Sequence, residues 1–303
     1  MSGRTLPGGA VAWWSGLRAA LGNARLLLWL LAANLVMAVV AVWPLLGPFE
    51  GSLAHHPASE QLTRRFDMPW WVDLTTSQAD AFARTVELIG LVGFLAALLG
   101  CFFSGGLLQA YRDTLEGRSM DRFMTSCRLW FARFAWLFVL SLPLYWFVHR
   151  MVNTHLELAL RDLLERVTDE RVGLLLTLGR AVLFLVLFDL VTLAVDYARV
   201  HAIVRTERSM LAALRAGLWF VLLHPVKVWT LEIWTVLLQC LALMIYLPVD
   251  GLIGRNSVPG LLLGLFAAQS FLLLRLFLRE TSHAGQVALY AAGPIDSSLQ
   301  KPW

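Results

Sequence analysis

The sequence predicts an all-α integral membrane protein, a polytopic bundle of transmembrane helices. Of its 303 residues, 58% are hydrophobic and only 15% are charged, and the mean hydropathy is +0.65. Soluble domains carry roughly a quarter of charged residues and about half of apolar ones. The apolar residues also gather in runs of about 20, the length at which a helix crosses a bilayer. This composition excludes a free nucleic-acid-binding protein, a secreted disulfide scaffold and a cytosolic enzyme.

Six runs are long and apolar enough to be spans. The first follows Arg18 and Arg25 and exceeds the length of a signal-peptide core, so we expect it to be retained. The third contains Pro143 and takes an interfacial lead-in from 129–133, and the fifth is expected to end just before Pro248. The predicted spans are 26–46, 88–110, 130–148, 172–195, 228–247 and 258–278, within a transmembrane domain of residues 1–282.

The distribution of basic residues predicts the orientation of the chain. With the N-terminus inside, the inner segments hold 16 Lys and Arg residues and the outer segments hold 8. Positive charge is retained on the cytoplasmic side, so both termini are predicted to be cytoplasmic. Of the 25 basic residues 23 are Arg, which indicates a GC-rich bacterial genome and hence a bacterial inner (cytoplasmic) membrane. The longest outer loop is then 47–84, and 283–303 is a cytoplasmic tail without sustained periodicity.

Amphipathic stretches with Trp or Phe and Arg precede the first, third and fifth spans, at 13–21, 123–134 and 209–220. Each has the pattern of a helix lying in the inner membrane interface. One interpretation is a chain of three repeated helical hairpins, each with its interfacial helix. The other is that basic, aromatic lead-ins are common to polytopic membrane proteins. On the outer side, leucines at helical spacing in 149–171 predict that the flanking helices continue beyond the bilayer, and 59–66 is a candidate short helix.

Three charged residues are predicted to lie at a similar depth near the inner side of the bilayer: Asp189, Glu232 and Arg275. Their distances from the inner ends of their spans are about 5–9 Å at a rise of 1.5 Å per residue. Charges inside spans are costly, so we expect an ion-pair cluster that joins three helices, assisted by Asp196 and Arg199. Such a cluster serves either as a structural link between helices or as a proton or ion relay.

Arg180 is the fourth charged residue within a predicted span, about 12 Å below the outer surface. We expect its side chain to extend toward the outer interface or to meet Glu87, and it is a candidate outer-leaflet anion contact.

No catalytic constellation is found in the sequence. It has no phosphate-binding glycine loop, no His-Glu-x-x-His, no Gly-x-Ser-x-Gly and no paired-cysteine motif. His55 and His56 stand before a proline, a pattern typical of a solvated turn. We therefore predict that the chain is not an enzyme and has no catalytic residue, no metal site and no cofactor.

Several short motifs carry a resemblance to known proteins. They are Gly105-Gly106-Leu107-Leu108-Gln109-Ala110-Tyr111, Asp196-Tyr197-Ala198-Arg199, the stretch 209–220 and His224-Pro225. With the six-span pattern, they resemble bacterial six-span membrane proteins of unknown function, which in turn resemble the membrane domain attached to some glycerophosphodiester phosphodiesterases. No soluble phosphodiesterase domain is present in this chain, so the resemblance implies an architecture and transfers no catalytic residue.

Two functions are expected from these observations. The first is a non-enzymatic inner-membrane scaffold or accessory subunit of a membrane complex, with a membrane-protein partner or a homo-oligomer, the lipid bilayer as surroundings and no nucleic acid. The second is a small transporter or channel-like permease that uses Asp189, Glu232 and Arg275. Hydrogen-bonded, mutually neutralised charges favour the first, and a water-filled cavity that reaches them favours the second.

Overall fold

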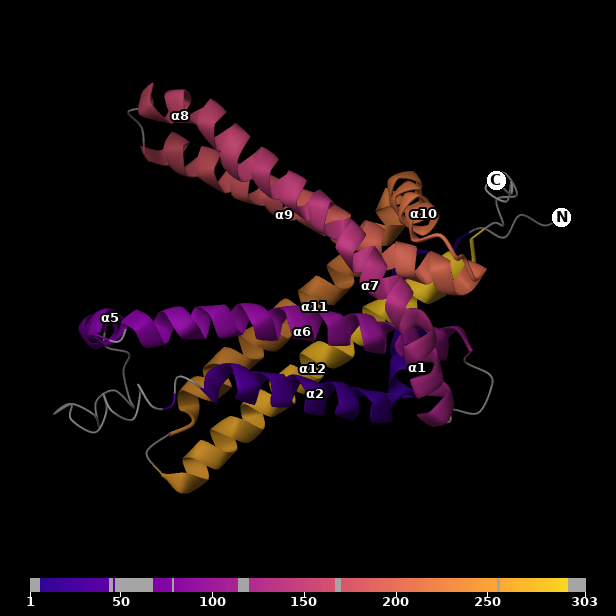
Figure 1. Ribbon diagram of the computed structural model, residues 1–303, viewed down its shortest axis with the longest axis horizontal. Helices are drawn as coiled ribbons and strands as arrows, with labels where there is room; N and C mark the ends of the chain where they lie inside the picture. The colour runs from indigo at the N-terminus through magenta and orange to yellow at the C-terminus, as the bar shows by residue number, and fades with distance from the viewer. Residues whose placement is uncertain are drawn as a thin grey trace. The chain divides into compact units, whose positions relative to one another are not determined.

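The structure, a computed structural model, describes residues 6–43, 46, 68–77, 79–113, 120–166, 170–254 and 257–293. Every regular element within these ranges is helical, and six helices are long and apolar enough to cross a membrane (Figure 1). The predicted fold class is confirmed. The helices are α1 (Gly9–Leu21), α2 (Ala24–Val42), α5 (Met68–Ser77), α6 (Ala79–Arg112), α7 (Met120–Arg150), the π-helix η2 (Met151–Leu156), α8 (Glu157–Arg166), α9 (Glu170–Arg205), α10 (Met210–Leu223), α11 (Pro225–Leu252) and α12 (Val258–Ala291).

Most of the helices extend beyond their predicted spans. The fifth does not stop before Pro248, because α11 continues to Leu252 with this proline inside the helix. The missing N–H of a proline costs one hydrogen bond, which a final turn tolerates better than a helix centre. The tail predicted at 283–303 also begins later, since α12 continues to Ala291. Its buried face there includes Ala284 and Gln286, and a face of small and polar residues is not visible as apolar periodicity.

The amphipathic stretches before the three spans differ from one another in the structure. Two are separate helices, α1 and α10, whereas 123–134 is part of the continuous helix α7. The helical continuation expected at 149–171 is present, because η2 and α8 prolong α7; whether it lies beyond the bilayer stays a prediction. Most of the predicted outer loop, 47–67, and with it the candidate helix at 59–66, lies outside the described residues. The rest of that loop is largely helical, in α5 and the start of α6.

The chain forms two compact units. Unit 1 comprises 1–19, 101–232 and 282–303, and unit 2 comprises 20–100 and 233–281. The largest fully buried side chains belong to unit 1, among them Tyr197, Phe134, Leu137, Ile203 and Val228. The chain passes from one unit to the other within α1, α6, α11 and α12.

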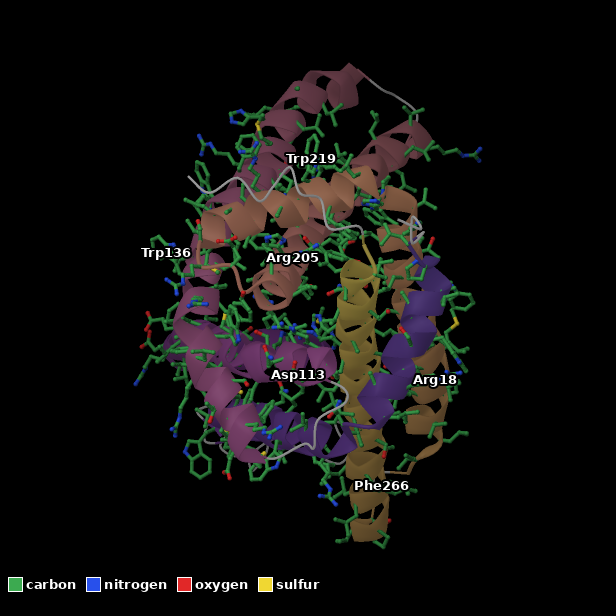
Figure 2. All side chains as sticks on the ribbon, turned by 90° about the vertical axis from the view of Figure 1, so that its right-hand side faces the viewer. Arg18, Asp113, Trp136, Arg205, Trp219 and Phe266 are labelled. Atoms are coloured by element: carbon green, nitrogen blue, oxygen red, sulfur yellow. The ribbon has the colours of Figure 1, made fainter. Side chains whose placement is uncertain are left out.

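Large apolar side chains cover much of the surface of the described residues. Trp136 of α7, Trp219 of α10 and Phe266 of α12 are all exposed, and Figure 2 labels them. A soluble monomer seldom exposes apolar patches of this extent, whereas a lipid bilayer accepts them.

Glycines permit the closest helix contacts of unit 1. A Cβ added at Gly217 of α10 would lie 2.5 Å from the backbone oxygen of Ala194 in α9. One added at Gly106 of α6 would lie 2.5 Å from the Sγ atom of Cys127 in α7. Part of the Gly105–Tyr111 motif is thus explained by packing, because a larger residue at position 106 would push α6 away from α7.

Candidate functional site

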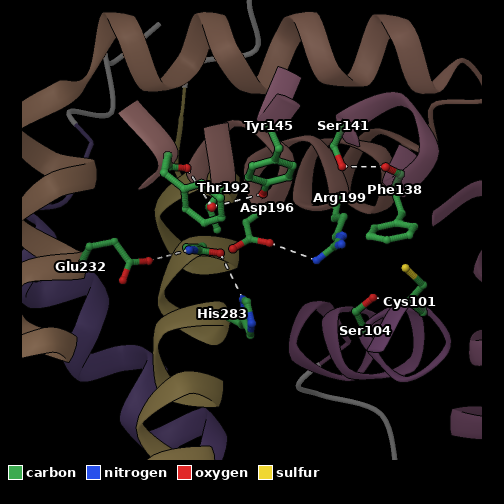
Figure 3. A network of polar contacts seen from close by, with 12 residues as sticks. Cys101, Ser104, Phe138, Ser141, Tyr145, Thr192, Asp196, Arg199, Glu232 and His283 are labelled. Atoms are coloured by element: carbon green, nitrogen blue, oxygen red, sulfur yellow. Dashed lines mark hydrogen bonds and ion pairs between the residues drawn. The ribbon is translucent and has the colours of Figure 1, made fainter. Parts of the chain in front are cut away.

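Unit 1 contains a group of hydrogen-bonded polar side chains, which we call the polar core (Figure 3). They come from α7, α9, α11 and α12, which are far apart in the sequence. Its members are Tyr145, Thr192, Asp196, Arg199, Glu232, Ser282, His283 and Gln286.

Glu232 of α11 accepts two hydrogen bonds from α12. The Oγ atom of Ser282 and the Nε2 atom of Gln286 each donate to Oε1 of Glu232, at 3.0 Å. The two donors are four residues apart, so they project from one face of the helix. Both are buried. Glu232 itself is half-buried. A carboxylate withdrawn from water is costly unless it is hydrogen-bonded, and these two bonds reduce that cost while joining α11 to α12.

His283 extends this network. Its Nδ1 atom lies 3.4 Å from Oε1 of Gln286, and because that oxygen is an acceptor, Nδ1–H is the donor. Gln286 therefore bridges the imidazole and Glu232, and its amide orientation is determined by both neighbours.

Asp196 and Arg199 form an ion pair within α9. The Nη1 atom of Arg199 donates to Oδ1 of Asp196 at 3.1 Å, and the side chains are 16% and 15% exposed. The pair is local, because residues three apart on a helix are neighbours. The pair therefore does not itself link α9 to another helix.

Tyr145 and Thr192 link α7 to α9. Their hydroxyl oxygens lie 3.2 Å apart, and the Oγ1 atom of Thr192 also donates to the backbone oxygen of Phe188 at 3.0 Å. A threonine hydroxyl has one proton, so the hydroxyl of Tyr145 is the donor to Thr192. The rings of Tyr145 and Phe188 add an aromatic contact, with centroids 4.8 Å apart.

The predicted cluster of Asp189, Glu232 and Arg275 is represented in the polar core by Glu232 alone. Asp189 is half-buried on α9 in unit 1, and Arg275 is exposed on α12 in unit 2. The three-residue cluster stays a prediction. Asp196 and Arg199, expected only to assist, are members of the core.

Arg180 forms an ion pair that the sequence does not predict. Its Nη1 atom lies 2.6 Å from Oε2 of Glu157 in α8. The structure replaces the expected partner, Glu87, because η2 and α8 prolong α7 and carry Glu157 alongside α9. Its role as an outer-leaflet anion contact stays a prediction, now for a guanidinium that already has a carboxylate partner.

A second polar contact that the sequence does not predict joins α9 to α12, near the end of α12. The Nδ1 atom of His201 lies 2.5 Å from the hydroxyl of Tyr290, whose ring packs on Phe220 of α10 with centroids 4.7 Å apart. Tyr197, from the Asp196–Arg199 motif, lies beside Phe220 and is fully buried, and its hydroxyl has no hydrogen-bond partner among the described residues. Tyr290 belonged to the predicted tail, so hydropathy gave no signal for this cluster.

Comparison of the chain with protein-family models, curated proteins and solved structures finds no match. The site must be interpreted from its own chemistry. In the part of the chain that the structure describes, no three His, Cys, Asp or Glu side chains are grouped so that they could hold a metal ion. What the polar core can do chemically is to bond helices to one another through buried donors and acceptors, or to exchange a proton at Glu232.

Proposed function

We propose that this protein is a non-enzymatic membrane scaffold or accessory subunit of a membrane complex. The observation that carries the proposal is the bonding of Glu232 in α11 to Ser282 and Gln286 in α12, which links two helices through side-chain hydrogen bonds. Polar groups that are hydrogen-bonded from one helix to another connect those helices and define their register.

The proposal places the protein in a bacterial inner membrane with both termini in the cytoplasm. Its support is the excess of basic residues on the predicted inner side and the high share of Arg. The partner would be another membrane protein or a second copy of the chain, and the exposed apolar helices offer the surface for it. The resemblance to bacterial six-span membrane proteins is consistent with this role.

A second candidate, a small permease, is favoured by one observation. The described hydrogen bonds to the Glu232 carboxylate come from two neutral donors, Ser282 and Gln286, so it forms no ion pair within the described residues. Unbalanced carboxylates inside a membrane protein are typical of proton and ion pathways.

Substitution of Glu232 distinguishes the two functions. Glu232→Gln keeps an oxygen that accepts from Ser282 and Gln286 but removes the titratable proton. For a scaffold, we expect the variant to unfold within about 2 °C of the wild type, to co-purify with the same stoichiometric partner or oligomer in mild detergent, and to behave identically in liposomes. Glu232→Ala, which leaves two buried donors without their acceptor, should lower stability by about 2 kcal/mol or more.

The contrary result would be a proton or ion flux into liposomes that the wild type supports and Glu232→Gln abolishes while remaining folded. Glu157→Gln, which removes a carboxylate outside the polar core, is the control for a general effect of charge. Flux lost in Glu232→Gln and kept in Glu157→Gln would establish the permease and reject the scaffold.

A further inference from the structure

Helix α10 crosses α9 and leaves one of its long faces free. Its buried residues are Met210, Ala213, Gly217 and Val221, and Gly217 lies directly against the α9 backbone at Ala194. In Figure 1 α10 is seen nearly end-on while α9 runs across the page, and in Figure 2 α10, marked by Trp219, is seen lengthwise. Because α9 is a candidate membrane span, a helix that crosses it lies roughly along the membrane plane.

The free face of α10 is apolar except for one arginine at its middle. The exposed large apolar residues of this face are Leu211, Leu218, Trp219, Leu222 and Leu223. Arg215 is also exposed, and it lies three or four residues from Leu211, Leu218 and Trp219. Residues at this spacing are neighbours on a helix surface, so the guanidinium emerges from an apolar surface.

Arg215 has no hydrogen bond or ion pair with any described residue. Glu207, the acidic residue nearest in sequence, is engaged elsewhere: its Oε1 atom accepts from the backbone N–H groups of Arg208 and Ser209, at 2.9 and 3.1 Å. The Arg208 side chain, just before the first turn of α10, is exposed and adds a second positive charge. The face is thus apolar and cationic, and Arg215 has no anionic partner among the described residues.

We propose that the free face of α10 binds anionic phospholipid, with leucines and Trp219 in the acyl boundary and the Arg215 guanidinium on the lipid phosphate. An arginine in an apolar face extends toward the headgroups, where a guanidinium can form two parallel hydrogen bonds with phosphate oxygens. Tryptophan is enriched at the same depth. The inference does not depend on whether the protein is a scaffold or a permease.

The test uses the purified full-length chain in a non-ionic detergent. Short-chain phosphatidylglycerol or phosphatidylcholine is titrated in, and bound lipid is counted by native mass spectrometry while the unfolding midpoint is recorded. For the wild type, we expect phosphatidylglycerol to bind more tightly and to raise the midpoint further than phosphatidylcholine. Arg215→Gln should weaken phosphatidylglycerol binding by about fivefold, because one basic side chain near an anionic surface contributes about 1 kcal/mol.

Three further variants complete the test. Arg215→Lys keeps the charge and should keep most of the binding, whereas Arg208→Gln should give a smaller loss. Arg84→Gln is the control, since Arg84 is exposed on α6 and, among the described residues, donates only to the backbone oxygen of Asp80 in its own helix. Equal binding of the two lipids, unchanged binding in both Arg215→Gln and Arg208→Gln, or an equal loss in Arg84→Gln would overturn the proposal. Binding of a protein instead of lipid to this face, lost in Arg215→Gln, would do so too.

Discussion

The two ends of a single helix, α12, differ sharply in their surroundings. In unit 2 its apolar residues, such as Leu262 and Phe266, are exposed, whereas in unit 1 Ala284, Gln286 and Leu289 are buried. Helix α6 shows the same change, from exposed Leu91 and Phe94 to buried Leu107, Leu108 and Tyr111. The more apolar end is therefore the less buried one. In a membrane protein, large apolar residues face lipid, and the protein interior can be built from small and polar residues.

The two units are expected to differ most in how much the free energy of unfolding falls when an aromatic side chain is removed. Phe134 of α7 is 0% exposed and Phe266 of α12 is 71% exposed. Phe134→Ala leaves a cavity and should lower the free energy of unfolding by about 3–5 kcal/mol. Phe266→Ala removes a surface group and should change it by about 0.5 kcal/mol or less. Denaturant or thermal unfolding of both variants in one detergent measures the contrast, and equal losses would show that Phe266 is also packed against protein.

Adding a methyl group at a helical glycine is expected to change stability by an intermediate amount. Gly217→Ala in α10 places a Cβ 2.5 Å from the Ala194 carbonyl oxygen and the Ala198 nitrogen, which are backbone atoms. The helices must separate, at a cost of about 1–3 kcal/mol. Gly93→Ala in α6 meets no atom within 4 Å and should be neutral or stabilising by up to about 1 kcal/mol, since alanine favours the helix. Midpoints of thermal unfolding report both, and a stable Gly217→Ala would mean that α10 does not pack closely on α9.

The spans could be predicted because the bilayer imposes a length and a composition on each of them. The partners of the charged residues could not. Glu232 and Arg180 could be singled out from the sequence, but their partners could not: Gln286 lies in the segment predicted to be a tail, and Glu157 lies in a predicted continuation of a span helix. Which residues meet depends on the register of packed helices and on where each helix ends, and hydropathy carries neither.

The smallest change in stability is expected from removing the partly exposed ion pair between Arg180 and Glu157. α7 and α8 run antiparallel to α9: Tyr145 contacts Thr192, and His149 contacts Phe184. The same register brings Glu157 to Arg180, and these two side chains form an ion pair.

The side chain of Glu157 is 54% exposed, which limits the strength of this pair. Arg180→Gln, Glu157→Gln and the double variant should give a coupling free energy of about 0–1 kcal/mol, decreasing with salt. A double-mutant cycle of thermal unfolding in detergent measures it. A coupling of several kcal/mol, insensitive to salt, would instead place this contact inside the bilayer, because only a low dielectric makes one ion pair that strong. The end of the α7–α9 hairpin that carries Glu157 would then lie within the membrane, and α8 with it.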